Sequence, residues 1–543
     1  MNRRDFLGVS GATMMTGIAG AVPGSSSGPE NLLAVNGPDP QRVEEGQLAK
    51  RRNIILFMPD EMRADSLACY GNPVCKTPNF DRLARGGTRF SNCHVQFPVC
   101  GASRCSLLTG WPTSVRGHRS LYYFLRPDEP NLFRYLRRAG YDVFWFGKND
   151  ALAAECFHDS VTEWAQSGGF AGAGQMRSVS RDLTPGSNSM LFAAGGDRRS
   201  TPDYQMLQRA IGILERKEMA RPFCIFLPLL EPHPPYTVPE DFYNLYSPSE
   251  VPRLVPPGLP KKPSHHAGIR EFYNLSTVDD ATLRKIRAVY YGQVSYSDWL
   301  FGELMSAIER TGRASDTALF LLSDHGDYAG DFGLIEKWPS GLEDCLTHVP
   351  LLGRVPGGKP GVVSNEMVEL YDLMPTCLDL AGTRTVHTHF ARSLAPQLNG
   401  RNGDPDRAAF SEGGYNVYEP QCFEPMGAGG GSYAGKIKLQ NERPETVSRS
   451  SMIRTQTHKL IVRPQGQCEL YSSKNDPQET DNLYGDGAVA RIQEELQTKL
   501  LNHYVNTTGI APMDKDPRDC PPFYPTAGNL TPSNWQEKLL DGQ

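Results

Sequence analysis

The feature that most constrains the fold is a pattern that occurs four times, a short apolar run followed at once by polar or charged residues. The four runs are Asn53–Met58, Tyr141–Phe146, Phe223–Leu230 and Ala318–Ser323. Short, nearly continuous apolar runs of this kind are typical of parallel strands that are buried on both faces. Segments with helical character, such as residues 78–85 and 132–139, lie between them. The pattern predicts an α/β fold with a doubly wound, mostly parallel sheet that is flanked by helices.

Each of these predicted strands is followed by acidic, basic or histidine side chains, which can bind ligands or transfer protons. These are Asp60 and Glu61, then Lys148, then His233, and finally Asp324 and His325. Open α/β sheets bind their ligands at the carboxyl ends of the strands, so we expect one active site along this edge. The three carboxylates suit a hard cation such as Ca²⁺, and Mg²⁺ less well, whereas the imidazole leaves room for a transition metal.

A second constellation is the run from Cys100 to Arg104, Cys-Gly-Ala-Ser-Arg. Leu107 and Leu108, with Gly110 as a stop, predict a short helix that begins just after Cys100. The first turn of a helix favours an anion, and Arg104 lies one turn further along the same face. On the run alone, a buried or disulfide-bonded cysteine would be the plainer interpretation.

This run resembles the maturation signature of formylglycine-dependent sulfatases, members of the alkaline phosphatase-like superfamily. Further segments resemble the same family, in order, from about residue 52 to about residue 485. They are residues 59–65, 70–72, 77–84, 147–148, 232–236, 323–327, 333–337, 453–460, 469–471, 476–477 and 482–483. The resemblance implies an alkaline phosphatase-like fold and a sulfuric ester hydrolase, with each role assigned to a matching position.

In these terms, Cys100 becomes formylglycine (3-oxoalanine), and the hydrate of its aldehyde attacks sulfur. The resemblance implies that Arg104 steadies the hydrate. It also implies that Lys148, His233 and Lys337 surround the sulfate, and that His233 or Lys337 protonates the leaving oxygen. The implied metal ligands, with Ca²⁺ expected, are Asp60, Glu61, Cys100, Asp324 and His325. Taken singly, each of three residues has a plainer structural interpretation: Lys148 as a loop cap, His233 as a turn residue and Lys337 as a surface lysine.

Two departures from the family pattern stand out. Asn149 and Asp150 occupy the stretch where the family often has a histidine two residues after the lysine, so Asp150 either orients Lys148 or contacts substrate. Ala102 stands where many members have proline, which resembles members matured by a radical-based enzyme. The resemblance also implies a formylglycine-generating maturase that acts before export.

The expected substrate is a sulfated polysaccharide or oligosaccharide. A sugar subsite is one interpretation of a set of aromatic and basic residues, and simple packing is the other. The set comprises Trp111, His118, Arg119, Tyr122, Tyr123 and Trp338. Two alternative functions stay open: a phosphonate or phosphate ester hydrolase of the same fold, and a non-catalytic protein that binds sulfated glycans.

The chain divides into four predicted regions. Residues 1–21 carry Arg3-Arg4 and a Gly- and Ala-rich stretch, which resembles a twin-arginine signal peptide, and residues 22–50 form a flexible leader. Residues 51–400 are the catalytic domain. Residues 401–543 are a smaller α+β subdomain with an antiparallel sheet, in which short strands near 452–471 precede a helix over 490–504.

Export by this route predicts a periplasmic or secreted protein. The net charge of -5 gives no support for nucleic-acid binding, and no apolar run is long enough for a mature membrane span. The twelve cysteines include Cys69 and Cys75, which flank a turn and could pair, but there is no Cys-x-x-Cys motif of a structural zinc site. The sequence leaves the oligomeric state open.

Overall fold

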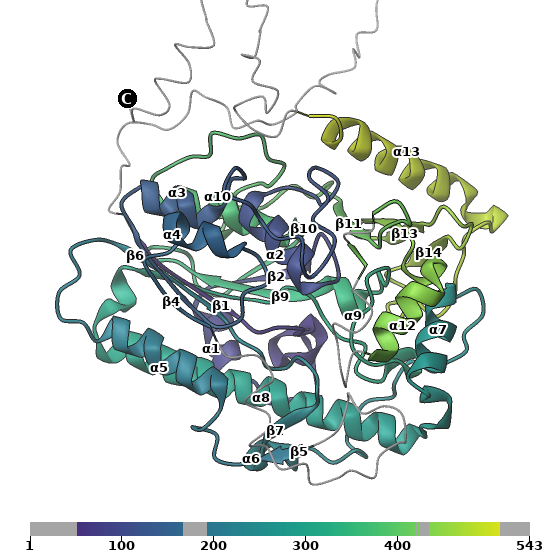
Figure 1. The fold of residues 1–543 in the computed structure, drawn as a ribbon, viewed down its shortest axis with the longest axis horizontal. Helices are drawn as coiled ribbons and strands as arrows, with labels where there is room; N and C mark the ends of the chain where they lie inside the picture. Colours follow the sequence, from purple (N-terminus) through teal and green to yellow (C-terminus); the bar gives the residue numbers. More distant parts are fainter. Residues whose placement is uncertain (1–50, 167–192, 420–421, 424–433, 511–543) are drawn as a thin grey trace, which may run out of the picture. The chain divides into compact units, whose positions relative to one another are not determined.

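A computed structural model describes residues 51–166, 193–419, 422–423 and 434–510 of the 543-residue chain (Figure 1). The predicted signal peptide, the leader and the tail from Pro512 onward lie outside the described residues. The main feature is a sheet of eight strands, in which β9 runs antiparallel to both its neighbours and all other pairs are parallel. In spatial order the strands are β10 (Val362–Glu369), β2 (Thr88–His94), β9 (His348–Arg354), β8 (Thr317–Leu322), β1 (Asn53–Met58), β6 (Phe223–Pro228), β3 (Asp142–Phe146) and β4 (Glu163–Ala165). The prediction of a mostly parallel, doubly wound sheet is confirmed.

The four strands predicted from the apolar runs are neighbours in this sheet, in the order β8-β1-β6-β3. All three pairings between them are parallel, with Leu56 of β1 opposite Phe226 of β6 and Phe320 of β8. Because parallel strands end at the same edge, the polar residues that follow each strand lie side by side. This arrangement positions the site.

Helices cover both faces of the sheet, as Figure 1 shows. One face carries α1 (Pro78–Gly86), α5 (Pro202–Leu214) and α8 (Asp280–Arg310), and the other carries α2 (Cys100–Thr109), α3 (Leu132–Arg138) and α10 (Leu373–Ala381). Side chains alternate along a strand, so Ile55 and Phe57 of β1 enter one core while Ile54 and Leu56 enter the other. Each fully buried side chain of this size stabilises the fold by roughly 1.5–3 kcal/mol.

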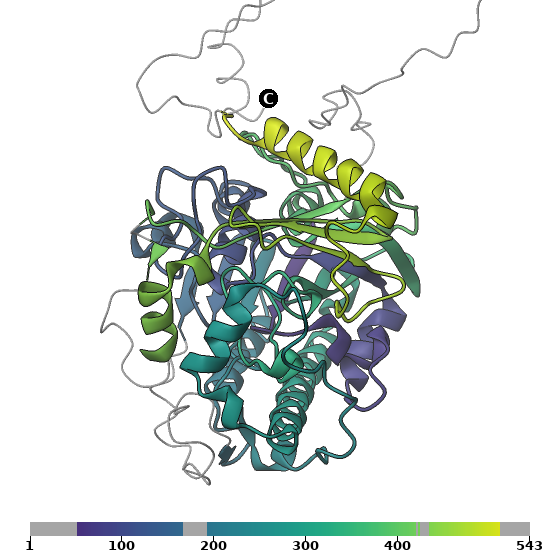
Figure 2. The ribbon, with the colours of Figure 1, turned by 90° about the vertical axis from the view of Figure 1, so that its right-hand side faces the viewer.

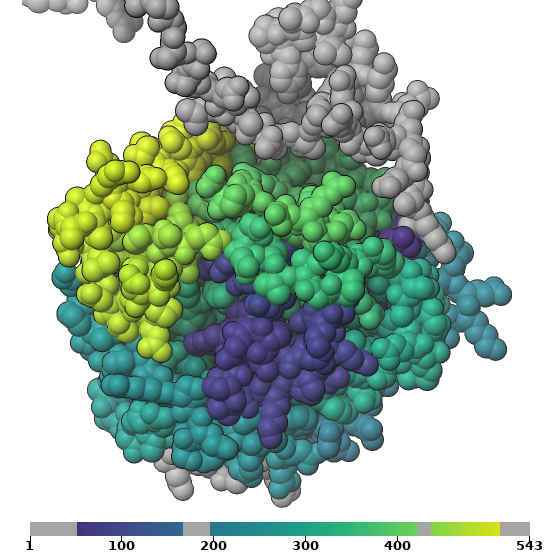
Figure 3. Space-filling view, turned by 180° about the vertical axis from the view of Figure 1, so that it is seen from behind, coloured from purple at the N-terminus to yellow at the C-terminus, as the bar shows by residue number. Residues whose placement is uncertain are grey.

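Strands β2, β9 and β10 were not predicted from the sequence. Strand β2 carries Arg89 and Asn92 among its apolar residues, and its burial is mixed along its length. Such a strand lacks both the continuous apolar run and the strict alternation that mark a strand in sequence. In the view from behind, early residues of the described chain, in purple, lie between later segments in green and teal (Figure 3).

A second, antiparallel sheet of four strands lies in the C-terminal part of the described chain (Figure 2). Its strands are β11 (Ala409–Gly413), β12 (Ser450–Arg454), β13 (His458–Val462) and β14 (Glu469–Ser472). Helix α13 (Ala490–Thr507) packs Leu496 and Leu500 against Ile453, Leu460 and Leu470 of this sheet. The predicted antiparallel sheet and the helix after it are confirmed.

The remaining helices and strands are short. They are α4 (Phe157–Ser160), β5 (Ala193–Gly195), β7 (Thr237–Pro239), α6 (Glu240–Tyr243), α7 (Ser264–Phe272), α9 (Asp344–Thr347), α11 (Ala395–Leu398) and α12 (Ala434–Glu442). Among the described residues, none of the helices is both long enough and apolar enough to cross a membrane. Cys69 and Cys75 do not pair; they and the other cysteines in the described part of the chain are free thiols.

Candidate active site

Two carboxylate-bearing loops meet at the edge of the sheet. Asp60 and Glu61 follow β1, Asp324 and His325 follow β8, and all four side chains are fully buried. The Glu61 backbone N–H donates to Asp324 Oδ1 at 3.2 Å, and the Met62 N–H donates to Ser323 Oγ at 2.8 Å. Glu61 adopts a left-handed backbone conformation, with φ 66°. These two hydrogen bonds fix the end of β1 relative to the end of β8.

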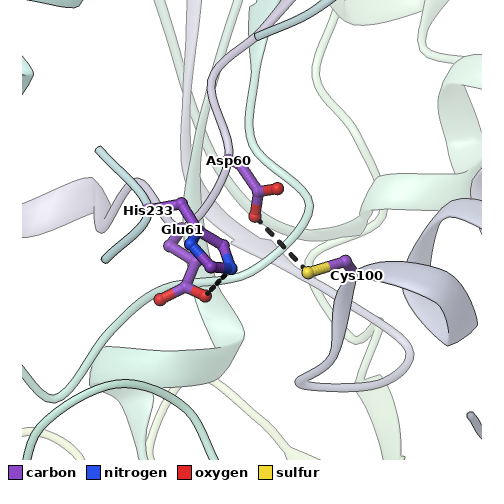
Figure 4. Close-up of side chains that lie close together, drawn as sticks. All are labelled: Asp60, Glu61, Cys100 and His233. Carbon is purple, nitrogen blue, oxygen red and sulfur yellow. Dashed lines mark hydrogen bonds and ion pairs between the residues drawn. The ribbon is translucent and has the colours of Figure 1, made fainter. Parts of the chain in front are cut away.

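Cys100 is the first residue of α2, at the end that favours an anion. Its Sγ lies 3.5 Å from Asp60 Oδ1, as drawn in Figure 4. The same Sγ lies 3.1 Å from His325 Nε2. A Cβ atom on Gly101 would lie 2.5 Å from the Ser120 carbonyl oxygen, so only glycine lets the following loop pack against the start of the helix. Burial, and then Asp60, raise the pKa of the Cys100 thiol well above its usual value.

Arg104 joins the two acidic loops from the next turn of α2. Its guanidinium donates to Asp324 Oδ2 at 2.7 Å and to Asp60 Oδ2 at 2.9 Å, and its side chain is only 1% exposed. Burial by itself would raise the pKa of Asp60, but Lys148 and Arg104 hold that pKa well below its usual range. Asp60 is therefore ionised and ready to bind a cation.

Lys148 and Asp150 form an ion pair at the end of β3. Lys148 Nζ lies 2.6 Å from Asp60 Oδ2, 3.1 Å from Asp150 Oδ2 and 3.5 Å from Cys100 Sγ. Gly147, with φ 139°, precedes them, and a Cβ there would lie 2.1 Å from the Pro228 carbonyl oxygen. That close approach to the end of β6 directs Lys148 towards Cys100.

His233, Lys337 and Glu61 form a third group. His233 Nε2 lies 3.1 Å from Glu61 Oε1 (Figure 4) and 2.9 Å from Lys337 Nζ, and Lys337 Nζ also contacts Glu61 Oε1. Burial, then Lys337 and Lys148, lower the pKa of His233 well below its usual value, so the imidazole is neutral. Burial, with Asp327 and Glu336, raises the pKa of Glu61 well above the ordinary range, although Lys337 opposes this.

The predicted metal ligands fall into two overlapping groups. Asp60, Cys100, Asp324 and His325 offer donor atoms within 4.8 Å of one another, and so do Asp60, Glu61, Cys100 and His233. Burial lowers the pKa of His325 to about 4, which leaves a neutral imidazole able to coordinate. Two buried carboxylates and this imidazole fit a divalent cation. Glu61 is turned towards His233 and Lys337, so the five predicted ligands do not all converge on one point.

The loop that carries Lys337 is held by the C-terminal part of the chain. Glu336 Oε1 lies 3.3 Å from Lys337 Nζ and 3.6 Å from Lys436 Nζ of α12, and all three side chains are 1% exposed. The Trp338 indole N–H donates to the Thr446 carbonyl oxygen at 2.6 Å. Glu336 and Lys436 were missed in the sequence, where nothing distinguishes them from ordinary surface residues.

Most of the predicted sugar-subsite residues are packing residues. Trp111 and Trp338 are buried, His118 is paired with Glu129 at 3.0 Å, and Arg119 pairs with Glu419 at 3.0 Å. Trp338 is therefore not a candidate for sugar stacking. Tyr122 and Tyr123 are 53% and 37% exposed, respectively, and are the members of the set that a ligand can reach.

Solved structures with the same fold include ester hydrolases. The phosphonate monoester hydrolase of Agrobacterium radiobacter is 23% identical, with a TM-score of 0.67 over 84% of this chain and 96% of that one. A structure solved with its substrate D-glucosamine-2-N,6-O-disulfate is 20% identical, with a TM-score of 0.64 over 85% of this chain and 99% of that one. At these identities the likeness establishes the fold, which is alkaline phosphatase-like.

The sequence defines the family within this fold. The family model described as Sulfatase matches residues 52–383. An arylsulfatase of Clostridium perfringens is 28% identical over 384 residues, which is 64% of this chain and 79% of that protein. Human iduronate 2-sulfatase is 28% identical over 383 residues, 61% of this chain and 69% of that protein. The chain belongs to the sulfatase family, and it is an enzyme that hydrolyses sulfate esters.

Proposed function

We propose that this sulfatase acts through a formylglycine at position 100, with a divalent metal ion, on sulfated carbohydrates. The observation that carries the proposal is the position of Cys100 at the start of α2, in contact with Asp60 and His325 and within 3.5 Å of the Lys148 ammonium. Its side chain stands where carboxylates, an imidazole, a guanidinium and an ammonium converge. That combination suits a nucleophile attacking an anionic ester.

Each of the surrounding side chains has a role that its geometry supports. Arg104 keeps Asp60 and Asp324 in place and carries positive charge to the first turn of α2. Lys148 and Lys337 supply the fixed positive charges that bind the sulfate oxygens and stabilise charge that develops during transfer. The hydrate of formylglycine carries two hydroxyl groups, so one can attack sulfur and the other can later expel sulfate as the aldehyde re-forms.

Asp60, Asp324 and His325 would hold the metal ion, with the residue at position 100, and Glu61 would join them by turning from Lys337. A bound divalent cation supplies Lewis-acid polarisation of an ester oxygen. We propose Ca²⁺, with Mg²⁺ less suited, because the carboxylates are the main donors. Removal of the metal with a chelator should lower the melting temperature, and Ca²⁺ should restore it better than Mg²⁺.

The leaving-group acid is assigned to the pair formed by His233 and Lys337. Their nitrogens lie 2.9 Å apart, so a single proton can be shared between them. The Glu336 carboxylate lies 3.3 Å from Lys337 Nζ and favours the protonated form of this lysine. A proton delivered from this pair to the bridging oxygen would complete the cleavage of the O–S bond.

Substrate class and cellular location are further parts of the proposal. Relatives and fold neighbours include iduronate 2-sulfatase and a structure bound to a disulfated glucosamine, which supports a sulfated polysaccharide or oligosaccharide as substrate. The Arg3-Arg4 segment supports export to the periplasm or the medium, after a maturase has acted on Cys100. A phosphonate or phosphate ester hydrolase is the alternative, favoured by the phosphonate monoester hydrolases among the fold neighbours.

The experiment that tests the proposal is mass spectrometry of the tryptic peptide that contains position 100, using protein made in its native host. Formylglycine is the expected finding, with loss of activity on sulfate esters in C100A. Unmodified cysteine in a preparation that turns over sulfate esters would contradict the proposed nucleophile. Turnover of matched aryl sulfate and aryl phosphate esters would separate the sulfatase from the alternative hydrolase.

A further inference from the structure

Lys148 and Asp150 are the charged side chains of the site that solvent reaches. Their side chains are 17% and 18% exposed, whereas those of Asp60, Glu61, Arg104, Asp324 and Lys337 are exposed by 1% or less. An ester that enters the site therefore meets this ion pair before it reaches the buried groups.

The turn that carries Asp150 is held in place on both sides. Asn149 Oδ1 accepts from the Leu152 N–H at 3.1 Å, and Asn149 Nδ2 donates to the Leu152 carbonyl oxygen at 2.8 Å, which closes the turn around Asp150. The Leu125 N–H also donates to the Ala151 carbonyl oxygen at 2.9 Å. Arg104 donates to the Lys148 carbonyl oxygen at 3.2 Å on the other side. Because the turn is constrained, the Asp150 side chain starts from a fixed position when a ligand binds.

Asp150 compensates the ammonium nearest to the nucleophile. Lys148 Nζ lies 2.6 Å from Asp60 Oδ2 and 3.1 Å from Asp150 Oδ2. The charge of this ammonium is therefore shared between two carboxylates and the incoming ester. An ammonium that already neutralises part of two carboxylates can compensate one negative charge on the ester, but it compensates two poorly.

We propose that Asp150 is a specificity-determining residue, which makes the site select esters whose transferred group carries one negative charge. A sulfate monoester carries one charge, whereas a phosphate monoester carries about two above its second pKa of about 6. One extra unit of charge about 6 Å from a carboxylate changes affinity by roughly a hundredfold at an effective dielectric constant of about 20. This inference deepens the proposed function, on which it rests, by naming the charge state that the site accepts.

The test compares three 4-nitrophenyl esters at about pH 8, a sulfate, a methylphosphonate and a phosphate. The first two are monoanions and the third is a dianion, so charge is separated from the identity of the central atom. In D150N, which preserves shape and removes the charge, we expect kcat/KM for phosphate relative to both monoanions to rise by about tenfold or more. E155Q is the matched control, because Glu155 is an exposed carboxylate on the next segment, paired with Arg126 at 2.8 Å.

An unchanged ratio in folded D150N, or an equal fall in all three rates, would overturn the inference and make Asp150 only a support for Lys148. A change in the ratio of sulfate to phosphonate, with phosphate unaffected, would also overturn it. If D150N does not fold, D150S takes its place, with melting temperature as the check. Wild-type turnover of the sulfate ester tests the proposed function separately. Calorimetric affinities for methanesulfonate, a monoanion, and for inorganic sulfate, a dianion, test the charge preference even if turnover is absent, and a D150N protein with the wild-type affinity ratio would refute it.

Discussion

Replacement of Arg104 by methionine should destabilise the protein strongly, because one guanidinium compensates two buried carboxylates. Asp60 would keep Lys148 as a partner at 2.6 Å, but Asp324 would keep only the backbone N–H groups of Glu61 and His325. Removal of one partner of a buried ion pair costs about 3–5 kcal/mol. The two pairs share one cation, so their costs do not add. We therefore expect the free energy of unfolding of R104M to fall by about 3–5 kcal/mol.

The assay is urea unfolding followed by tryptophan fluorescence, in chelator-treated samples. The free energy of unfolding of R104K should fall less than that of R104M. A lysine ammonium can still reach one of the two carboxylates, although it cannot bind both as the forked guanidinium does. R407M is the matched control, since buried Arg407 bridges Glu369 and Asp372 at 2.8 and 2.6 Å, away from the site.

Both methionine variants should be destabilised, but only R104M should regain stability when excess Ca²⁺ is added, because the cation can replace the lost guanidinium between Asp60 and Asp324. A free energy of unfolding for R104M within about 1 kcal/mol of wild type, measured without metal, would refute the reasoning. Equal recovery of R407M in Ca²⁺ would refute the assignment of the cation to Asp60 and Asp324.

Three further changes test separate parts of the structure. G147A should lower kcat by about a hundredfold, because a Cβ there displaces Lys148, whereas G212A, where nothing lies within 4 Å, should leave kcat unchanged. K337M should reduce kcat/KM by about 10²–10⁴-fold on esters with poor leaving groups and much less on activated aryl sulfates; equal losses on both would exclude Lys337 as part of the acid. Burial lowers the pKa of His387 to about 3, so the unfolded chain takes up a proton near pH 6.5 that the folded chain resists. Its contribution to stability is complete above pH 6.5 and is lost as the pH falls towards 3, and H387Q should show a smaller fall in urea midpoint between pH 6.5 and 4 than wild type does.

The sequence is sufficient to predict the parts of the molecule that local patterns encode. Continuous apolar runs located β1 and β6, and the polar residues directly after such strands include Asp60 and Asp324, which the structure brings to one edge. Polar residues that follow parallel strands lie close together in space, because neighbouring parallel strands end at the same edge of the sheet. The same rule predicts that Lys148 and His233 lie at this edge, and the structure places both there.

Features that depend on contacts between distant segments were not predictable. Strand β2 is built from mixed residues and is a strand because β9 and β10 pair with it on either side. Trp338 resembles a sugar-binding residue next to Lys337, but the Thr446 carbonyl oxygen accepts its indole N–H in the interior. The orientation of Glu61 towards His233 depends on charges from three separate loops, and a linear sequence does not show how those charges balance.

The contact between Glu336 and Lys436 bears on how this enzyme can be shortened or recombined with others. An exchange that stops near residue 400 would remove the ammonium 3.6 Å from Glu336, and with it the Thr446 acceptor of Trp338. Glu336 would then compete with substrate for the Lys337 ammonium, since their charged atoms lie 3.3 Å apart. The minimal transferable unit of this enzyme therefore runs at least through the strand that follows Thr446, and chimeras that swap substrate-facing loops should keep residues 434–454 together with residues 333–343.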